Sequence, residues 1–201
     1  MSLLLRIFRP HVRTIWQQLC EEIDADFIPG KGLRGADTIK AYHENWTIII
    51  DTYKRGKRPT ITRIRAPYIN ADSFYFRIVN KGVFSSARKS AGMQDVVIGF
   101  PRFDEEYIIQ GNDEQKLRQM FTPERIRKII TWQPAIDLWN QEDKSWMTNE
   151  MGEGQNELSF QTQGVITDID QLRNLYDLFA EILNHLCHIG SAYEDDPLLP
   201  K

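Results

Sequence analysis

The chain has 201 residues, of which 41% are hydrophobic and 26% are charged, with 2 Cys, 12 Gly and 9 Pro. These values exclude a disulfide-stapled miniprotein, a collagen-like fibre and a mostly disordered chain. No apolar run approaches the roughly 18 residues that span a bilayer. Arg6 also interrupts the apolar N-terminus, which makes that segment a poor signal peptide. We therefore expect a cytoplasmic protein that is not transmembrane.

The net charge of −3 hides an asymmetry between the two halves of the chain. Residues 1–100 carry 16 Lys and Arg against 9 Asp and Glu, whereas residues 101–201 carry 9 against 19. Such a division can mark an anion-binding face, two halves that fold against each other, or subunits that pair head to tail. The charge count leaves these three alternatives open.

Residues 11–23 have the apolar spacing of an amphipathic helix, and Pro10 suits its first turn. A loop over residues 29–35 follows, and from Thr38 to Gln110 the apolar period changes to two. The expected strands cover residues 39–43, 46–53, 60–66, 73–79, 94–100 and 105–110. Because strand follows strand with no clear helix between them, we expect an antiparallel sheet.

Two short helices should come next. Asn112 or Asp113 can cap the first, and Thr122 can cap the second, with Pro123 at its first helical position and Glu124 against the helix dipole. Later strands are expected at residues 135–139, near Trp146 and at residues 157–163, with a mobile loop at residues 148–156.

The last helix is the most clearly defined element of the sequence. Asp168 can cap it, Gln171 stands three residues further on, and Gly190 ends it. Its apolar stripe consists of Leu172, Leu175, Tyr176, Phe179, Leu183 and Leu186. A stripe of this size must pack against a sheet or another helix.

These elements together predict an α+β fold. We expect a curved, mainly antiparallel sheet with the long C-terminal helix packed on one face and the N-terminal amphipathic helix nearby. The sequence contains no repeat and no long linker, so one domain over residues 1–201 is the better count. Residues 1–9 and 191–201 should be loosely ordered.

Several motifs with a known chemistry are incomplete. Residues 30–35 spell G-x-G-x-x-G, but they follow a helix and precede strands, so the motif predicts a flexible connector and no dinucleotide site. Neither a phosphate-binding loop nor the G-x-S-x-G motif of a serine nucleophile is present. Cys20 and Cys187 each flank an apolar stripe without a neighbouring base, which predicts core or rim residues.

The last helix also carries three potential metal ligands. Glu181, His185 and His188 have the spacing i, i+4 and i+7, which can place three ligands on one side of a helix. That side lies opposite the apolar stripe, so the three residues should face solvent unless another element covers them. We therefore expect no metal site, no cofactor and no catalytic residue.

A basic cluster is the one feature that indicates a partner. It comprises Lys54, Arg55, Lys57, Arg58, Arg63 and Arg65. The first four occupy one hairpin turn, and the last two, two positions apart on the next strand, share a face. The hypothesis is an anion-binding site for nucleic acid or an acidic membrane surface. The alternative is that the strand arginines pair with the acidic C-terminal half and the turn is merely solvated.

One block resembles a family. Residues 103–113, then Leu117 and residues 121–124, form an F-D-x-x-aromatic strand, a polar turn, a short helix and an F-T-P helix start. This arrangement resembles bacterial domains of unknown function over the C-terminal half of the chain. The later strand around Leu158 and the helix with Phe179 fit the same layout. The resemblance implies a cytoplasmic or membrane-adjacent bacterial protein, and it transfers no catalytic residue.

The sequence thus leaves three functions open. The preferred one is a non-enzymatic binding or interaction module, acting on a protein partner or as a homo-oligomer. The second is an anionic partner bound through the hairpin at residues 54–65. The third is a small-molecule binder or enzyme with a pocket between the sheet and the C-terminal helix. No motif identifies the ligand.

Overall fold

The computed structural model describes residues 3–31, 35–54, 56, 58–82, 94–141 and 155–194, with residues 3–11 and 141 described by backbone alone. The strands are β1 (Asp26–Ile28), β2 (Thr38–His43), β3 (Trp46–Tyr53), β4 (Ile61–Asn70), β5 (Phe76–Asn80), β6 (Gln94–Asp95), β7 (Tyr107–Gly111), β8 (Asp137–Gln141), β9 (Gln155–Gln163) and β10 (Ala192–Tyr193). The helices are α1 (Leu3–Ile23), α2 (Pro101–Glu106), α3 (Glu114–Met120), α4 (Glu124–Trp132) and α5 (Ile169–His188).

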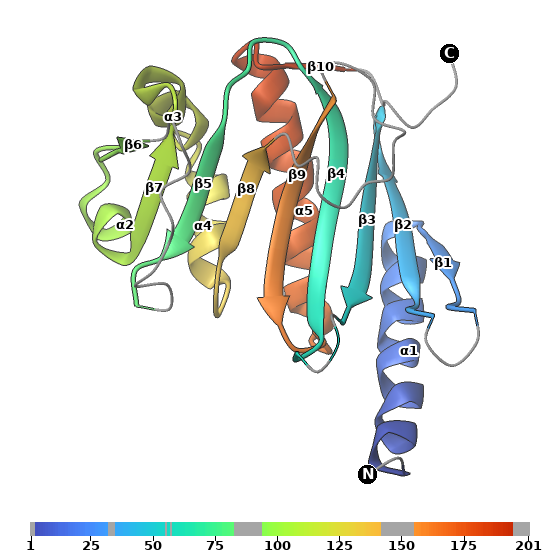
Figure 1. Cartoon of the computed structure of the whole chain (residues 1–201). Coiled ribbons are helices and arrows are strands. Elements are labelled where there is room, and N and C mark those ends of the chain that lie inside the picture. Colours follow the sequence, from blue (N-terminus) through green and yellow to red (C-terminus); the bar gives the residue numbers. More distant parts are fainter. Residues whose placement is uncertain are drawn as a thin grey trace.

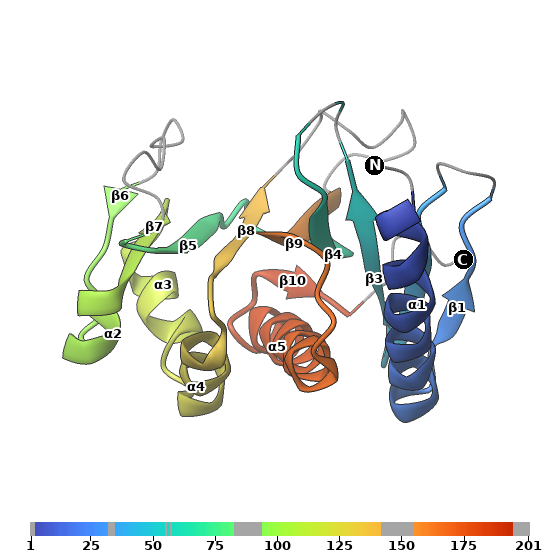
Figure 2. The same cartoon turned by 90° about the horizontal axis from the view of Figure 1, so that it is seen from below.

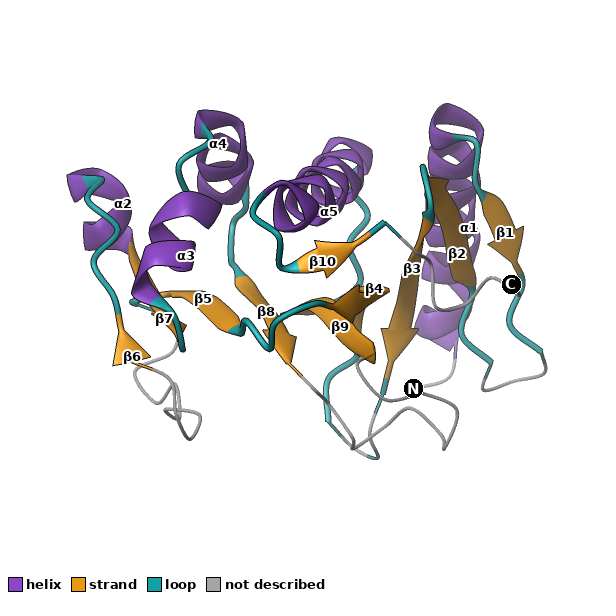
Figure 3. Cartoon of the chain, turned by 90° about the horizontal axis from the view of Figure 1, so that it is seen from above, coloured by secondary structure: helices purple, strands orange, loops and turns teal. Residues whose placement is uncertain are grey.

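All strands belong to one sheet in the order β1-β2-β3-β4-β9-β8-β5-β7-β6, and β10 pairs with the end of β4. Every pairing is antiparallel, as predicted. The sheet is curved, and the five helices lie on one side of it (Figures 1 to 3). Helix α5 occupies the concave side, between α1 and the pair α3 and α4 (Figure 2). The predicted fold class is confirmed.

Helix α5 forms as its sequence predicts. The Asp168 carboxylate accepts a hydrogen bond of 3.0 Å from the Gln171 amide, which caps the N-terminus. At the other end, Gly190 adopts a positive φ of 74° that terminates the helix without strain. The stripe between them is fully buried, apart from the half-buried Tyr176, and Leu178 and Ile182 are buried beside it. This burial contributes on the order of 10 kcal/mol before entropy costs.

Helix α1 packs beside α5 through its C-terminal half. Trp16 and Leu19 are buried, and the Trp16 indole donates a hydrogen bond of 3.1 Å to the carbonyl of Ile166 in the loop before α5. Glu22 forms an ion pair with Arg173 of α5. The helix begins at Leu3, well before the predicted start, so Pro10 lies within it. Its N-terminal half extends past the strand ends (Figure 1).

Four short elements differ from the expectation. Residues 101–106 form α2 where two strands were expected to meet, and β6 is reduced to Gln94 and Asp95. Pro101 starts that helical turn, and the Asp104 carboxylate accepts hydrogen bonds from the amides of Ile98 and Gly99. Strands β1 and β10 were not expected at all. Their two or three residues are too few for a period to be read.

The described residues near the chain ends belong to regular elements or precede them. Ser191 is buried and Ala192–Tyr193 form β10, so the tail is structured as far as Glu194. The backbone of residues 3–9 is helical. The strand expected near Trp146 and most of the loop expected at residues 148–156 lie outside the described residues, and residues 155 and 156 belong to β9.

Substituting Phe179 tests the packing of α5 against the sheet. The Phe179 ring has 0% exposure, so Phe179→Asp removes its burial and places a charge in the core. We expect a loss of about 5 kcal/mol or more in unfolding free energy. Urea unfolding followed by circular dichroism measures it. Asn184→Gln at an exposed position of the same helix should change stability by less than about 1 kcal/mol. A Phe179→Asp variant that melts cooperatively near the wild-type temperature would contradict this placement.

Candidate binding surface

The face of the sheet opposite the helices carries polar side chains from strand to strand. Ile64, Phe160 and Leu138 are cross-strand neighbours in the core beneath α5. Since side chains alternate along a strand, the residues between these positions face the side without helices. One continuous row on that side consists of Arg65, Ser159, Trp139, Arg77, Gln110 and Asp95. We call this side the helix-free face.

Asp51 of β3 is the centre of the first charged cluster on this face. Its carboxylate accepts two hydrogen bonds of 2.9 Å from the Arg63 guanidinium and one of 2.6 Å from Arg65. On the other side, Arg65 lies 3.8 Å from the Glu157 carboxylate, to which the Ser159 hydroxyl also donates. Bidentate and shared contacts of this kind fix the guanidinium planes. The cluster links β3, β4 and β9.

A second charged cluster lies two strands further along. Arg77 of β5 donates hydrogen bonds of 2.9 and 3.1 Å to Asp137 of β8, and the Gln161 amide donates a third of 3.2 Å. The Arg77 guanidinium lies 5.9 Å from the centre of the Trp139 ring. Asp137 is only 2% exposed, so its charge is stabilised by these partners and not by water. Both clusters are balanced in charge.

Exposed aromatic rings flank these clusters. Tyr42 and Tyr53 are 43% and 42% exposed. The Arg63 guanidinium stacks 4.7 Å from the Tyr53 ring, and the Lys40 ammonium lies 5.2 Å from that of Tyr42. The helix-free face thus offers aromatic surface held in place by cations, together with ordered hydrogen-bonding groups.

The structure divides the predicted anion-binding residues into three groups. Arg63 and Arg65 are bound by Asp51, a carboxylate of the N-terminal half, and Arg65 also by Glu157 of the C-terminal half. Lys54 and Arg58 are exposed at the hairpin, and neither forms an ion pair with a described carboxylate. Arg55 and Lys57 lie outside the described residues. Anion binding by these residues stays a prediction.

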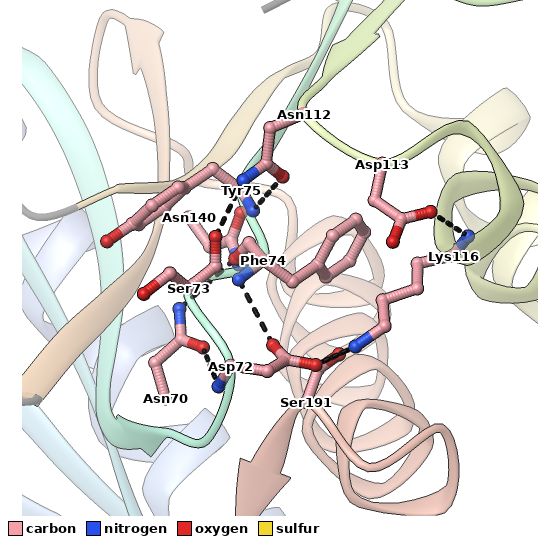
Figure 4. Close-up of polar contacts among 10 residues, drawn as sticks. All are labelled: Asn70, Asp72, Ser73, Phe74, Tyr75, Asn112, Asp113, Lys116, Asn140 and Ser191. Carbon is pink, nitrogen blue, oxygen red and sulfur yellow. Dashed lines mark hydrogen bonds and ion pairs between the residues drawn. The ribbon is translucent and has the colours of Figure 1, made fainter. Parts of the chain in front are cut away.

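The turn between β4 and β5 is held by a polar junction (Figure 4). The Asn112 side chain accepts a hydrogen bond from the Tyr75 amide and donates one to the Ser73 carbonyl. The buried Asn140 side chain accepts from the Phe76 amide at 2.6 Å and donates to the Phe74 carbonyl at 3.0 Å. These contacts satisfy the backbone of a turn in which Ser73 has a positive φ of 58°.

The same junction joins this turn to α3 and to the residue before β10. Lys116 of α3 forms an ion pair with Asp72 and donates a hydrogen bond of 3.2 Å to the Ser191 hydroxyl, which donates to Asp72 at 3.1 Å (Figure 4). Ser191 is 1% exposed, so this hydroxyl cannot meet a substrate. The junction is therefore structural.

The His residues of α5 line a hollow of about 380 Å³ between α5 and the end of α3. The His185 Nε2 atom lies 2.9 Å from the Gln119 carbonyl oxygen, and the rings of His185 and His188 stack with centres 5.4 Å apart. Glu181 is bound by Arg125 of α4 at 3.0 Å. The expected solvated side of α5 is therefore partly covered. Among the described residues, no three potential ligands are grouped for a metal ion.

A second hollow, of about 460 Å³, lies where α1 meets β1 and contacts Cys20. Neither hollow lies between the sheet and α5, the place proposed for a pocket. Burial raises the pKa of Cys20 and of Cys187 to about 11, and nearby carboxylates contribute to both shifts. Both side chains are therefore thiols at neutral pH, as expected of structural cysteines.

The helices of the described chain include none that is long and apolar enough to cross a membrane. No family model and no curated protein matches the sequence. A solved structure that resembles the chain is the crystal structure of the mycobacterial trehalose monomycolate transport factor A, TtfA, with a TM-score of 0.56 at 10% sequence identity. The match covers 94% of this chain and 98% of that chain. At this identity the likeness shows a shared fold.

The resemblance to bacterial domains of unknown function stays a prediction. The structure shows which elements the matching residues 103–124 form. Phe103 and Asp104 belong to α2, the strand begins at Tyr107, and Asp113 caps α3 through the Lys116 amide. Helix α4 has Pro123 at its N-cap, and the Thr122 hydroxyl donates to the Arg118 carbonyl. The predicted Thr122 cap is therefore wrong by one position.

Sequence reasoning missed the carboxylates of the helix-free face. Asp51, Asp137 and Glu157 each stand within a strand at a position that alternates with apolar core residues. A buried acidic residue within a strand usually indicates a pairing partner, and that signal was available for Asp51. The identity of each partner depends on the strand register.

Removing the Asp51 carboxylate tests the first cluster. Asp51→Ala deletes three hydrogen bonds to two guanidinium groups that are less than a fifth exposed. We expect a loss of about 3 kcal/mol in unfolding free energy, measured by urea denaturation. As a control, Glu114→Ala breaks the exposed pair with Arg118 and should cost less than about 1 kcal/mol. Equal losses in the two variants would show that the Asp51 cluster stabilises the protein no more than an exposed ion pair does.

The raised thiol pKa values predict slow alkylation. With a pKa of about 11, the thiolate fraction of Cys187 at pH 8 is roughly 100 times smaller than that of an ordinary cysteine. Iodoacetamide labelling read by mass spectrometry should therefore be at least about tenfold slower in the folded protein than in urea, and should accelerate as pH rises. Rapid labelling of folded Cys187 at pH 7 would contradict the assignment and indicate a reactive thiol.

Proposed function

We propose that this protein is a non-enzymatic binding module that engages its partner through the helix-free face. The observation that carries the proposal is the one-sided arrangement of the helices (Figures 2 and 3). It leaves the paired arginines and the exposed tyrosines described above on the other face. Tyr42 and Tyr53 provide exposed aromatic area there, and aromatic side chains dominate binding interfaces. The charge-balanced clusters hold this surface rigid before binding.

The shared fold with TtfA supports this reading in a general way. That protein is described as a mycobacterial trehalose monomycolate transport factor. A bacterial, cytoplasmic setting for the present chain remains part of the proposal. The binding-module hypothesis does not depend on the cargo being the same.

An anionic partner at the hairpin is the second candidate function. It is favoured by the exposure of Lys54 and Arg58, which have no ion-pair partner among the described carboxylates. Two further cations, Arg55 and Lys57, stand between them in the sequence. A cluster of cations without local neutralisation raises the local concentration of an anionic partner.

Site-specific photocrosslinking in cells tests the first candidate. A benzophenone side chain at Tyr42 or Tyr53 on the helix-free face should give discrete adducts. The same side chain at Lys128 of α4, exposed on the helix side, serves as the matched control and should give none. Adducts at Lys128 together with none at either tyrosine would contradict the proposal and place the interface on the helices.

A further inference from the structure

We infer that the hairpin end of the sheet docks on an anionic lipid surface. The inference rests on the second candidate function, an anionic partner of the hairpin, and names that partner. Lys54 and Arg58 extend into solvent beyond the paired part of β3 and β4. Tyr53, next to them, is 42% exposed, and a tyrosine beside cations suits the interface between lipid headgroups and water.

The described charges at the two ends of β3 differ in sign, and the hairpin end also has exposed Asp168 and Asp170 close to the start of β4. Strand β3 runs from the acidic β2–β3 turn with exposed Glu44 to the basic hairpin, a distance of about 25 Å. Exposed Glu194 follows β10 at the same acidic end, where both carboxylates raise the pKa of Cys187. A negatively charged plane attracts Lys54 and Arg58 and repels Glu44 and Glu194, which favours contact through the hairpin tip.

A nucleic acid fits this charge distribution less well. A polyanion laid across the helix-free face would meet the carboxylates of Asp51, Asp137 and Glu157, which already neutralise the arginines there. One side of the Tyr53 ring is also occupied by Arg63, so base stacking on that side is blocked. Lys54 and Arg58 stand at a tip and not along a groove. Cations grouped at a tip can all approach a planar lipid surface at the same time.

Helix α1 begins at this same end of the molecule. Its N-terminal half extends past the strand ends beside the hairpin end of the sheet (Figure 1). In the sequence, this part reads Leu3-Leu4-Leu5-Arg6-Ile7-Phe8-Arg9, a mixture of apolar and basic residues that is typical of helices lying in a membrane interface. A lipid surface accounts for both features, whereas a nucleic acid accounts only for the cations.

Vesicle flotation across a salt series tests the inference. Vesicles of phosphatidylglycerol and phosphatidylcholine in equal parts should bind the full chain, and vesicles of phosphatidylcholine alone should not. Binding should weaken as salt rises, because the attraction is electrostatic. The double variant Lys54→Gln/Arg58→Gln should bind roughly tenfold more weakly. Its melting temperature should match that of the wild type, since both side chains are exposed.

Arg102→Gln/Lys128→Gln removes the same charge from exposed positions away from the hairpin and is the matched control. This variant should bind the anionic vesicles like the wild type, and equal weakening in both variants would overturn the inference.

Single-stranded RNA is tested in parallel. Hairpin-dependent binding of RNA without binding of vesicles would overturn the lipid surface but keep the anionic partner. Binding of neither would overturn both.

Discussion

The apolar stripe of α5 determines the layout of the whole molecule. A stripe of this size must be buried, and the concave side of a curved antiparallel sheet provides the area for it. Helices α1 and α4 then pack beside α5 through Glu22–Arg173 and Arg125–Glu181. All helices lie on the same side of the sheet as α5. The other face is therefore formed by strand side chains alone, and these determine what it can bind.

On the helix-free face, charged side chains of neighbouring strands form ion pairs. Each arginine of the helix-free face has a carboxylate on a neighbouring strand, so the clusters around Asp51 and Asp137 are fixed in geometry and balanced in charge. Balanced clusters give specificity to an interface more readily than they give long-range attraction. Long-range attraction is instead concentrated at the hairpin tip, where Lys54 and Arg58 are exposed. The two properties therefore belong to two different parts of one surface.

The sequence predicts correctly those elements that depend on residues close together in the chain. The cap Asp168, the strand at residues 46–53 and the last helix depend on neighbours in sequence, and they were correctly predicted. Asp113 is one of the two caps predicted for α3. Helix α2 and strand β10 are too short to show a period. The two-residue spacing correctly placed Arg63 and Arg65 on one face, but their main partner is Asp51. That pairing depends on the register of β3 against β4, which a single sequence does not contain.

The central claim is that partners meet the helix-free face and its hairpin end, and not the side covered by α3, α4 and α5. Hydroxyl-radical footprinting with anionic vesicles tests it most directly, because each face has an exposed aromatic reporter. Tyr53 reports on the helix-free face at 42% exposure, and Trp132 reports on α4 at 53%. We predict that vesicles slow the oxidation of Tyr53 and leave that of Trp132 unchanged. Protection of Trp132 with unchanged oxidation of Tyr53 would contradict the account.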